Sequence, residues 1–164
     1  MDISTTKFRL RVFECIVAIT LTFAAWTAHA HQFVANDLLI MHPYTIEPAA
    51  GTTVDVPIYM VIKNSGGVSD RLLSASSPFG KSVAIVTRVA GAEPVTITSG
   101  IELPANSETT VGPRAAFVLL RNLTESLGGY QYFPMTLVFE KTGTVEVEVY
   151  VEDASEIPSS QPKQ

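Results

Sequence analysis

The alternation of apolar and polar residues with a period of two is the feature that most constrains the fold of this chain. It is clearest at 143–151, in the segment GTVEVEVYV, where four valines alternate with polar or amphipathic residues. This pattern is typical of a strand with one buried and one solvent-exposed face. Similar runs recur at short intervals between Gly, Pro, Asn and Ser residues, and helical periodicity is almost absent. The sequence therefore predicts an all-β fold, a two-sheet antiparallel β-sandwich.

Nine segments carry the strand pattern, and Gly- or Pro-containing turns separate most of them. They are Asp37–Ile46, Val54–Asn64, Arg71–Pro78, Ser82–Arg88, Glu93–Thr98, Ser107–Val111, Ala115–Leu120, Pro134–Glu140 and Gly143–Val151.

The first thirty residues have the parts of a secretory signal. A basic start precedes the apolar run Val12–Trp26, and the run ends in the small-x-small sequence Ala28-His29-Ala30. An uncleaved membrane anchor is the alternative, but the run is short for a spanning helix and Glu14 interrupts it. We expect cleavage after Ala30, one β-sandwich domain over 31–153 and a disordered tail over 154–164, rich in Ser, Pro and Gln. The product would be a soluble periplasmic protein with no stable membrane anchor.

The composition of the mature part excludes several classes of function. Residues 31–164 contain eight Lys and Arg against fourteen Asp and Glu, a net charge of −6, which argues against binding to nucleic acid or anionic membranes. The only cysteine, Cys15, lies in the signal, so the mature chain has no disulfide, thiolate metal site or cysteine nucleophile. No serine nucleophile motif with a usable base is present either.

Several segments, in order and spacing, resemble the periplasmic PCu(A)C copper-chaperone domain family. They are DLLI at 37–40 leading into His42-Pro43, YMVIKNSG at 59–66, DRL at 70–72, ASSP at 75–78, IELPA at 101–105 and MTLVFEKTG at 135–143. The resemblance spans roughly residues 37–151. It implies a cupredoxin-like β-sandwich of about nine strands outside the cytoplasmic membrane, which handles copper for the assembly of copper enzymes.

The chain departs from this family at the usual Cu(I) site, which consists of two His and two Met. By the resemblance, one His-x-Met pair should fall at Val86 and Arg88 and the other at Phe117 and Leu119, and an intervening Met is absent near Pro94. Arg88 also adds a positive charge where a cation would bind. We therefore expect the Cu(I) site of the family to be lost.

The two histidines of the mature chain offer a different copper site. If cleavage makes His31 the first residue, it can supply its terminal amine and its imidazole, and His42 can supply a third nitrogen, an arrangement called a histidine brace. Nitrogen ligands in a tetragonal plane suit Cu(II), and the amine, with a pKa of about 7.7 to 8.0, can lose its proton to copper at neutral pH. The chain is similar in this respect to family members from methane-oxidising bacteria that lack the His/Met motif. Water is the default further ligand, with Asp37, Asp70 and Met41 as candidates.

This hypothesis makes a geometric demand. A straight strand would separate residues 31 and 42 by roughly 36 Å, whereas two nitrogens on one metal lie within about 4 Å of each other. Residues 32–37 must therefore double back, with Asn36-Asp37 as the turn, or His31 must meet His42 of another molecule.

The predicted function is that of a Cu(II)-binding, non-enzymatic carrier or assembly factor that delivers copper to an acceptor copper enzyme. Two other functions stay open, a metal-free interaction module of the same fold and a small copper-dependent oxidative enzyme. Each histidine also has a structural interpretation, because His31 can simply follow the signal and His42 can end a strand.

Overall fold

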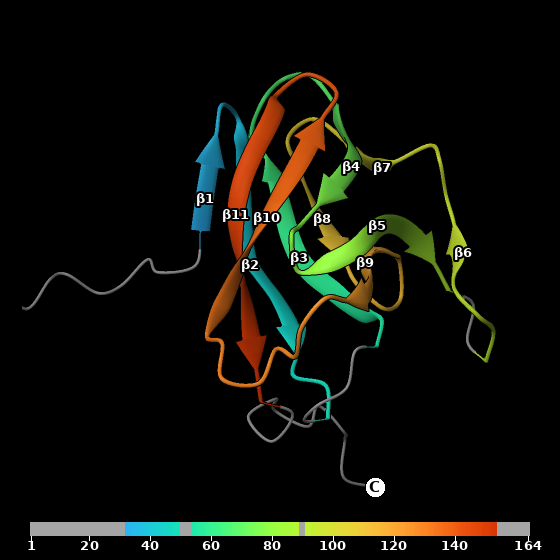
Figure 1. The fold of residues 1–164 in the computed structure, drawn as a ribbon. Helices are drawn as coiled ribbons and strands as arrows, with labels where there is room; N and C mark the ends of the chain where they lie inside the picture. The colour runs from blue at the N-terminus through green and yellow to red at the C-terminus, as the bar shows by residue number, and fades with distance from the viewer. Residues whose placement is uncertain (1–31, 50–53, 89–90, 154–164) are drawn as a thin grey trace, which may run out of the picture. The chain divides into compact units, whose positions relative to one another are not determined.

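The computed structural model describes residues 32–49, 54–88 and 91–153. The predicted signal at 1–30, His31 and the predicted tail at 154–164 lie outside these ranges. The described residues form eleven strands (Figure 1). They are β1 (Gln32–Ala35), β2 (Leu38–Ile46), β3 (Val56–Asn64), β4 (Asp70–Ser76), β5 (Gly80–Thr87), β6 (Val95–Thr96), β7 (Ile101–Leu103), β8 (Ser107–Val111), β9 (Ala116–Leu123), β10 (Tyr132–Phe139) and β11 (Gly143–Glu152).

The strands form one curled sheet around a single core. Its main path runs β6-β5-β9-β3-β2-β11-β10-β4-β7, with β1 paired to β2 and β8 paired to β3. The strand that joins the two layers is β3, because its first part, from Val56 to Ile58, pairs with β9 and its second part, from Met60 to Asn64, pairs with β8. In Figure 1 the sheet curls from β1, β2 and β11 on the left to β5, β6 and β9 on the right.

This architecture confirms the predicted all-β, cupredoxin-like sandwich. Each of the nine expected strands is present, with ends shifted by a few residues. The short strands β1 and β7 are additional to that set, and the pairing of β11 with β2 is parallel, whereas the other pairs run antiparallel. Within the described ranges, no helix is long and apolar enough to span a membrane.

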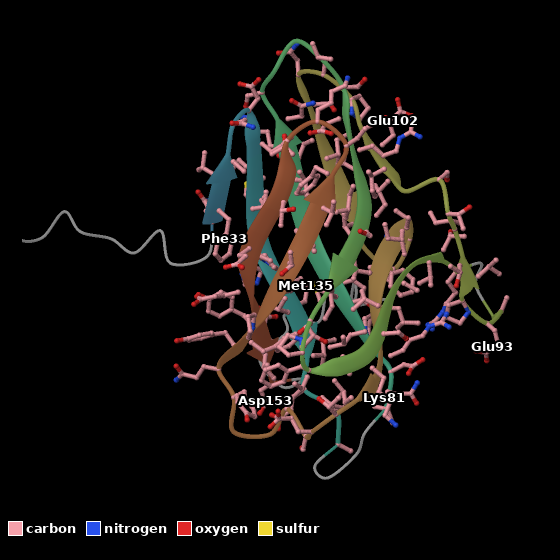
Figure 2. The ribbon with its side chains drawn as sticks, turned by 45° about the horizontal axis from the view of Figure 1, so that its top comes forward. Phe33, Lys81, Glu93, Glu102, Met135 and Asp153 are labelled. Carbon is pink, nitrogen blue, oxygen red and sulfur yellow. The ribbon has the colours of Figure 1, made fainter. Side chains whose placement is uncertain are left out.

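The core follows the predicted alternation. In β11, Val147 and Val149 are buried and Val145 and Val151 pack against the same core. Met135 of β10, labelled in Figure 2, is 1% exposed and lies in this core. Thr45 is a buried polar residue of β2, and its hydroxyl donates a hydrogen bond of 2.8 Å to the carbonyl of Pro57 in β3. This hydrogen bond replaces the one that the hydroxyl would make with water, so burying it in the sandwich costs little free energy.

Candidate metal site

The hairpin formed by β1 and β2 determines where the N-terminal end of the described chain lies. Its ladder pairs Ala35 with Leu38 next to the turn and Gln32 with Met41 at the open end. Asn36 begins the two-residue turn with φ of 51°, a left-handed conformation that Asn tolerates well. Phe33, labelled in Figure 2, packs against the core and fixes β1 on the sandwich. Residues 32–37 therefore double back, which is one of the two arrangements that the copper hypothesis allows, and the turn is at Asn36-Asp37.

The backbone of β2 is irregular where the hairpin ends. Its register with β3 shifts between Met41 and Tyr44, so that β2 contains one extra residue in the pair His42-Pro43. His42 adopts φ of 49°, which is uncommon for a residue with a side chain. A bulge of this kind re-aims a side chain, and strained backbone conformations concentrate at functional sites. The histidine side chain is 50% exposed, whereas Pro43 is buried.

Glu152 and Tyr44 are partners of the His42 imidazole among the described residues. Its Nε2 lies 2.6 Å from Oε1 of Glu152, at the end of β11. Its ring stacks on Tyr44 with a centroid separation of 5.1 Å, and Tyr44 in turn contacts Tyr59 edge-on at 5.5 Å. Burial, together with the negative charge of Glu152, raises the pKa of Tyr44 above its usual value, so the phenol is protonated at neutral pH. The described part of the site thus combines an imidazole nitrogen with a carboxylate.

A shallow pocket of about 380 Å³ lies on the β3 side of His42. Its lining includes Met41 and Tyr44 of β2, Tyr59 and Met60 of β3, and Gly112. Met60 is 2% exposed and packs in the core. Met41 is adjacent to His42 in the chain and lines the same pocket, so it is the one suggested additional ligand that lies beside the histidine.

The other two suggested ligands lie elsewhere. Asp37 and Asp70 line a separate pocket of about 280 Å³, at the turn end of the β1–β2 hairpin. Asp70 accepts backbone hydrogen bonds from Arg71 at 2.7 Å, Lys141 at 2.9 Å and Thr142 at 3.0 Å, and so ties the β10–β11 turn to β4. The structure thus gives Asp70 a structural role and does not bring either carboxylate to His42.

The predicted remnant of the Cu(I) site is formed by two neighbouring strands. Val86 of β5 pairs with Phe117 of β9, and the guanidinium of Arg88 lies 5.8 Å from the centre of the Phe117 ring. Leu119 lines a third pocket together with Arg88 and Arg121. Over the ranges that the structure describes, no group of three or more His, Cys, Asp and Glu side chains could hold a metal ion. The positions of the family site are therefore brought together, but they carry apolar and cationic side chains.

Comparisons with known proteins agree with this fold. The model of the LpqE-like family, which is described as a lipoprotein family, matches residues 38–151. The copper-bound PCuAC domain of PmoF2 is 29% identical, with a TM-score of 0.63 over 75% of this chain and 98% of that domain. The apo PCuAC domain of PmoF1 is 28% identical, with a TM-score of 0.63 over 75% of this chain and 99% of that domain.

The solution structure of a Cu(I)-loaded protein from Deinococcus radiodurans shares the fold at 20% identity, with a TM-score of 0.56 over 79% of this chain and 85% of that protein. No curated protein matches the chain significantly. Since the family model covers more than two thirds of the sequence, this chain belongs to the LpqE-like family of PCuAC-type domains.

Proposed function

We propose that the chain, after cleavage behind Ala30, is a periplasmic Cu(II)-binding protein that carries copper to a copper enzyme or helps to assemble one. Its ligands are the terminal amine and imidazole of His31 and the imidazole of His42. Family membership and the copper-bound relative support a role in binding copper rather than in catalysis. The lipoprotein family description and the signal-like start of the chain support a location outside the cytoplasm. Cys15, the single cysteine, precedes this cleavage point, so a chain that begins at His31 has no thiol to carry a lipid.

The observation that carries the proposal is the register of the β1–β2 hairpin. Its last described pair is Gln32 with Met41, and His42 follows Met41 directly in the chain. Directly opposed residues of an antiparallel pair have Cβ atoms about 4.5–5.5 Å apart, so the open end of the hairpin at Gln32 lies beside the residue that precedes His42. The hairpin thereby removes the separation of roughly 36 Å that a straight strand would impose, and we infer that the nitrogens of His31 and His42 can reach one metal ion.

The chemistry of these donors favours Cu(II). Imidazole and amine nitrogens suit copper in a tetragonal plane, and copper stands at the top of the affinity order of divalent first-row metals. All three nitrogens must be deprotonated to bind, so copper affinity is expected to fall steeply between about pH 7 and pH 5. Because His42 is half-exposed, an acceptor protein can reach the metal and take it by stepwise ligand exchange.

The test is a Cu(II) titration followed by electron paramagnetic resonance. It compares the chain that begins at His31 with a chain that carries one additional N-terminal residue, which turns the amine into an amide. We expect one type-2 copper per processed chain, with hyperfine splitting from three nitrogens, and loss of this signal in the extended chain.

The two other functions predict different results. Absence of a tight site in both chains would contradict the proposal and favour a metal-free interaction module. Turnover of oxygen or peroxide by the copper-loaded chain with a reductant would instead favour an oxidative enzyme.

A further inference from the structure

The contact between His42 and Glu152 has the spacing of two neighbouring ligands on one copper ion. Two donors bound at about 2.0 Å and at right angles to each other are about 2.8 Å apart. The Nε2–Oε1 distance in the structure is 2.6 Å. The two side chains therefore need only a small displacement to hold an ion between them.

The backbone around Glu152 holds its carboxylate at this point. Glu152 is opposite Ile46 in the parallel ladder of β11 and β2. Its carbonyl also accepts a hydrogen bond of 2.8 Å from the amide of Glu47. The side chain is 28% exposed, so the carboxylate is partly shielded from water yet lies at the surface. Backbone pairing fixes the base of the side chain, and the contact with Nε2 of His42 orients the carboxylate, so it loses less freedom when it binds a cation.

We propose that Glu152 is a direct oxygen ligand of the copper ion bound by His42. This inference rests on the proposed function, since it adds a fourth protein ligand to the three nitrogens. Copper takes the place of the proton between Nε2 and Oε1, and that proton moves to Nδ1 or to solvent. A carboxylate is a harder ligand than a thioether, and its negative charge offsets part of the charge of the divalent ion. Glu152 therefore makes the site selective for Cu(II) over Cu(I).

The control comes from the same strand. Glu148 lies on the same face of β11, four residues before Glu152, and its carboxylate contacts the hydroxyl of Tyr150 at 3.4 Å. Glu148→Gln and Glu152→Gln remove the same charge from the same strand. The ion pair of Glu152 is between partly exposed side chains, so its loss should leave the fold intact. Urea unfolding of each variant checks that expectation.

The experiment uses the chain that begins at His31, its Glu152→Gln variant and its Glu148→Gln variant, with Cu(II) and Cu(I) titrated separately against competing chelators. We expect Glu152→Gln to weaken Cu(II) binding by at least the roughly 10- to 100-fold that loss of an outer-shell partner costs, and to change the copper hyperfine coupling while the three-nitrogen pattern persists. Binding of Cu(I) should change much less, and Glu148→Gln should behave as the wild type does.

Each other outcome overturns a defined part of this scheme. Unchanged Cu(II) affinity in Glu152→Gln refutes the role of Glu152 alone. Weaker binding with an unchanged copper spectrum means that Glu152 only orients His42, which refutes ligation. A wild-type chain without a three-nitrogen copper signal refutes the proposed function as well.

Discussion

The left-handed backbone at His42 predicts that glycine gives a more stable protein than alanine at this position, the reverse of the usual order in a strand. Strand positions normally favour Ala over Gly by about 0.5–1 kcal/mol, because Gly loses more conformational freedom on folding. At φ of 49°, however, a Cβ atom costs about 1–2 kcal/mol that Gly avoids. We therefore expect His42→Gly to be more stable than His42→Ala.

The comparison isolates the backbone, because both variants lose the same side-chain contacts. These contacts are the half-exposed ion pair with Glu152, worth about 0–1 kcal/mol, and the stacking on Tyr44, worth about 0.5–1.5 kcal/mol. The net advantage of Gly over Ala is then about 0.75 kcal/mol, the difference between the midpoints of the two ranges. Lys63, an exposed residue of β3 that lies in a regular part of the ladder, is the matched control. There, Lys63→Ala should be more stable than Lys63→Gly.

Urea unfolding measures both differences. With a denaturant slope of about 1–3 kcal/mol per molar urea, an advantage of about 0.75 kcal/mol moves the midpoint by roughly 0.25–0.75 M. If Ala is more stable than Gly at both positions, the backbone at His42 is not strained, and the bulge gives no evidence of a functional constraint. Both His42 variants should also lose the tight Cu(II) site of the processed chain.

Two further predictions concern the scaffold. Burial acts to raise the pKa of Asp70, but hydrogen bonds from Thr142, Lys141 and Arg71 outweigh it and hold the pKa below its usual value. The stability that Asp70 contributes is therefore present above about pH 4, and it is lost as the pH falls through the folded-state pKa. Asp70→Asn should lower the free energy of unfolding by about 1–3 kcal/mol at pH 7 and by much less near pH 2. An equal difference between the urea midpoints of wild type and variant at both pH values would contradict this prediction. Gly100→Ala should destabilise the fold more than Gly91→Ala. Both glycines have positive φ, but only at Gly100 would the new Cβ collide with a backbone oxygen, that of Leu72. Equal thermal midpoints of the two variants would rule the collision out.

The strands could be predicted because each carries its own local signal. Alternating burial and turn residues are properties of neighbouring positions, so nine segments could be identified from the sequence. β1 and β7, with four and three residues, are too short to show a period. The reversal at Asn36-Asp37 was expected only because one copper ion would have to reach both histidines, and the β1–β2 hairpin contains that reversal.

The partners of the candidate site could not be predicted in the same way. Glu152 is 110 positions after His42 and reaches it only because β11 lies parallel to β2, a pairing that no local pattern reveals. In the sequence Glu152 is one more polar residue on the exposed face of an alternating strand. Asp70 illustrates the reverse case, since a carboxylate that looked free to bind metal is used by the backbone of a distant turn. Residue type and spacing therefore indicated the histidine but not its oxygen partner.

On the proposed assignment, copper binding is coupled to export. While residue 31 follows Ala30, its nitrogen is an amide, which gives up its proton far less readily than an amine, so only isolated imidazoles are available to copper. Cleavage creates the amine with its pKa of about 7.7 to 8.0, and it does so one residue before the first described pair of the β1–β2 hairpin. Phe33, two residues after that terminus in the chain, packs against the core, and β1 pairs with β2, the strand that contains His42. The ligand set is thus complete only in the processed chain, which is why one additional N-terminal residue is expected to abolish the site although it changes no side chain.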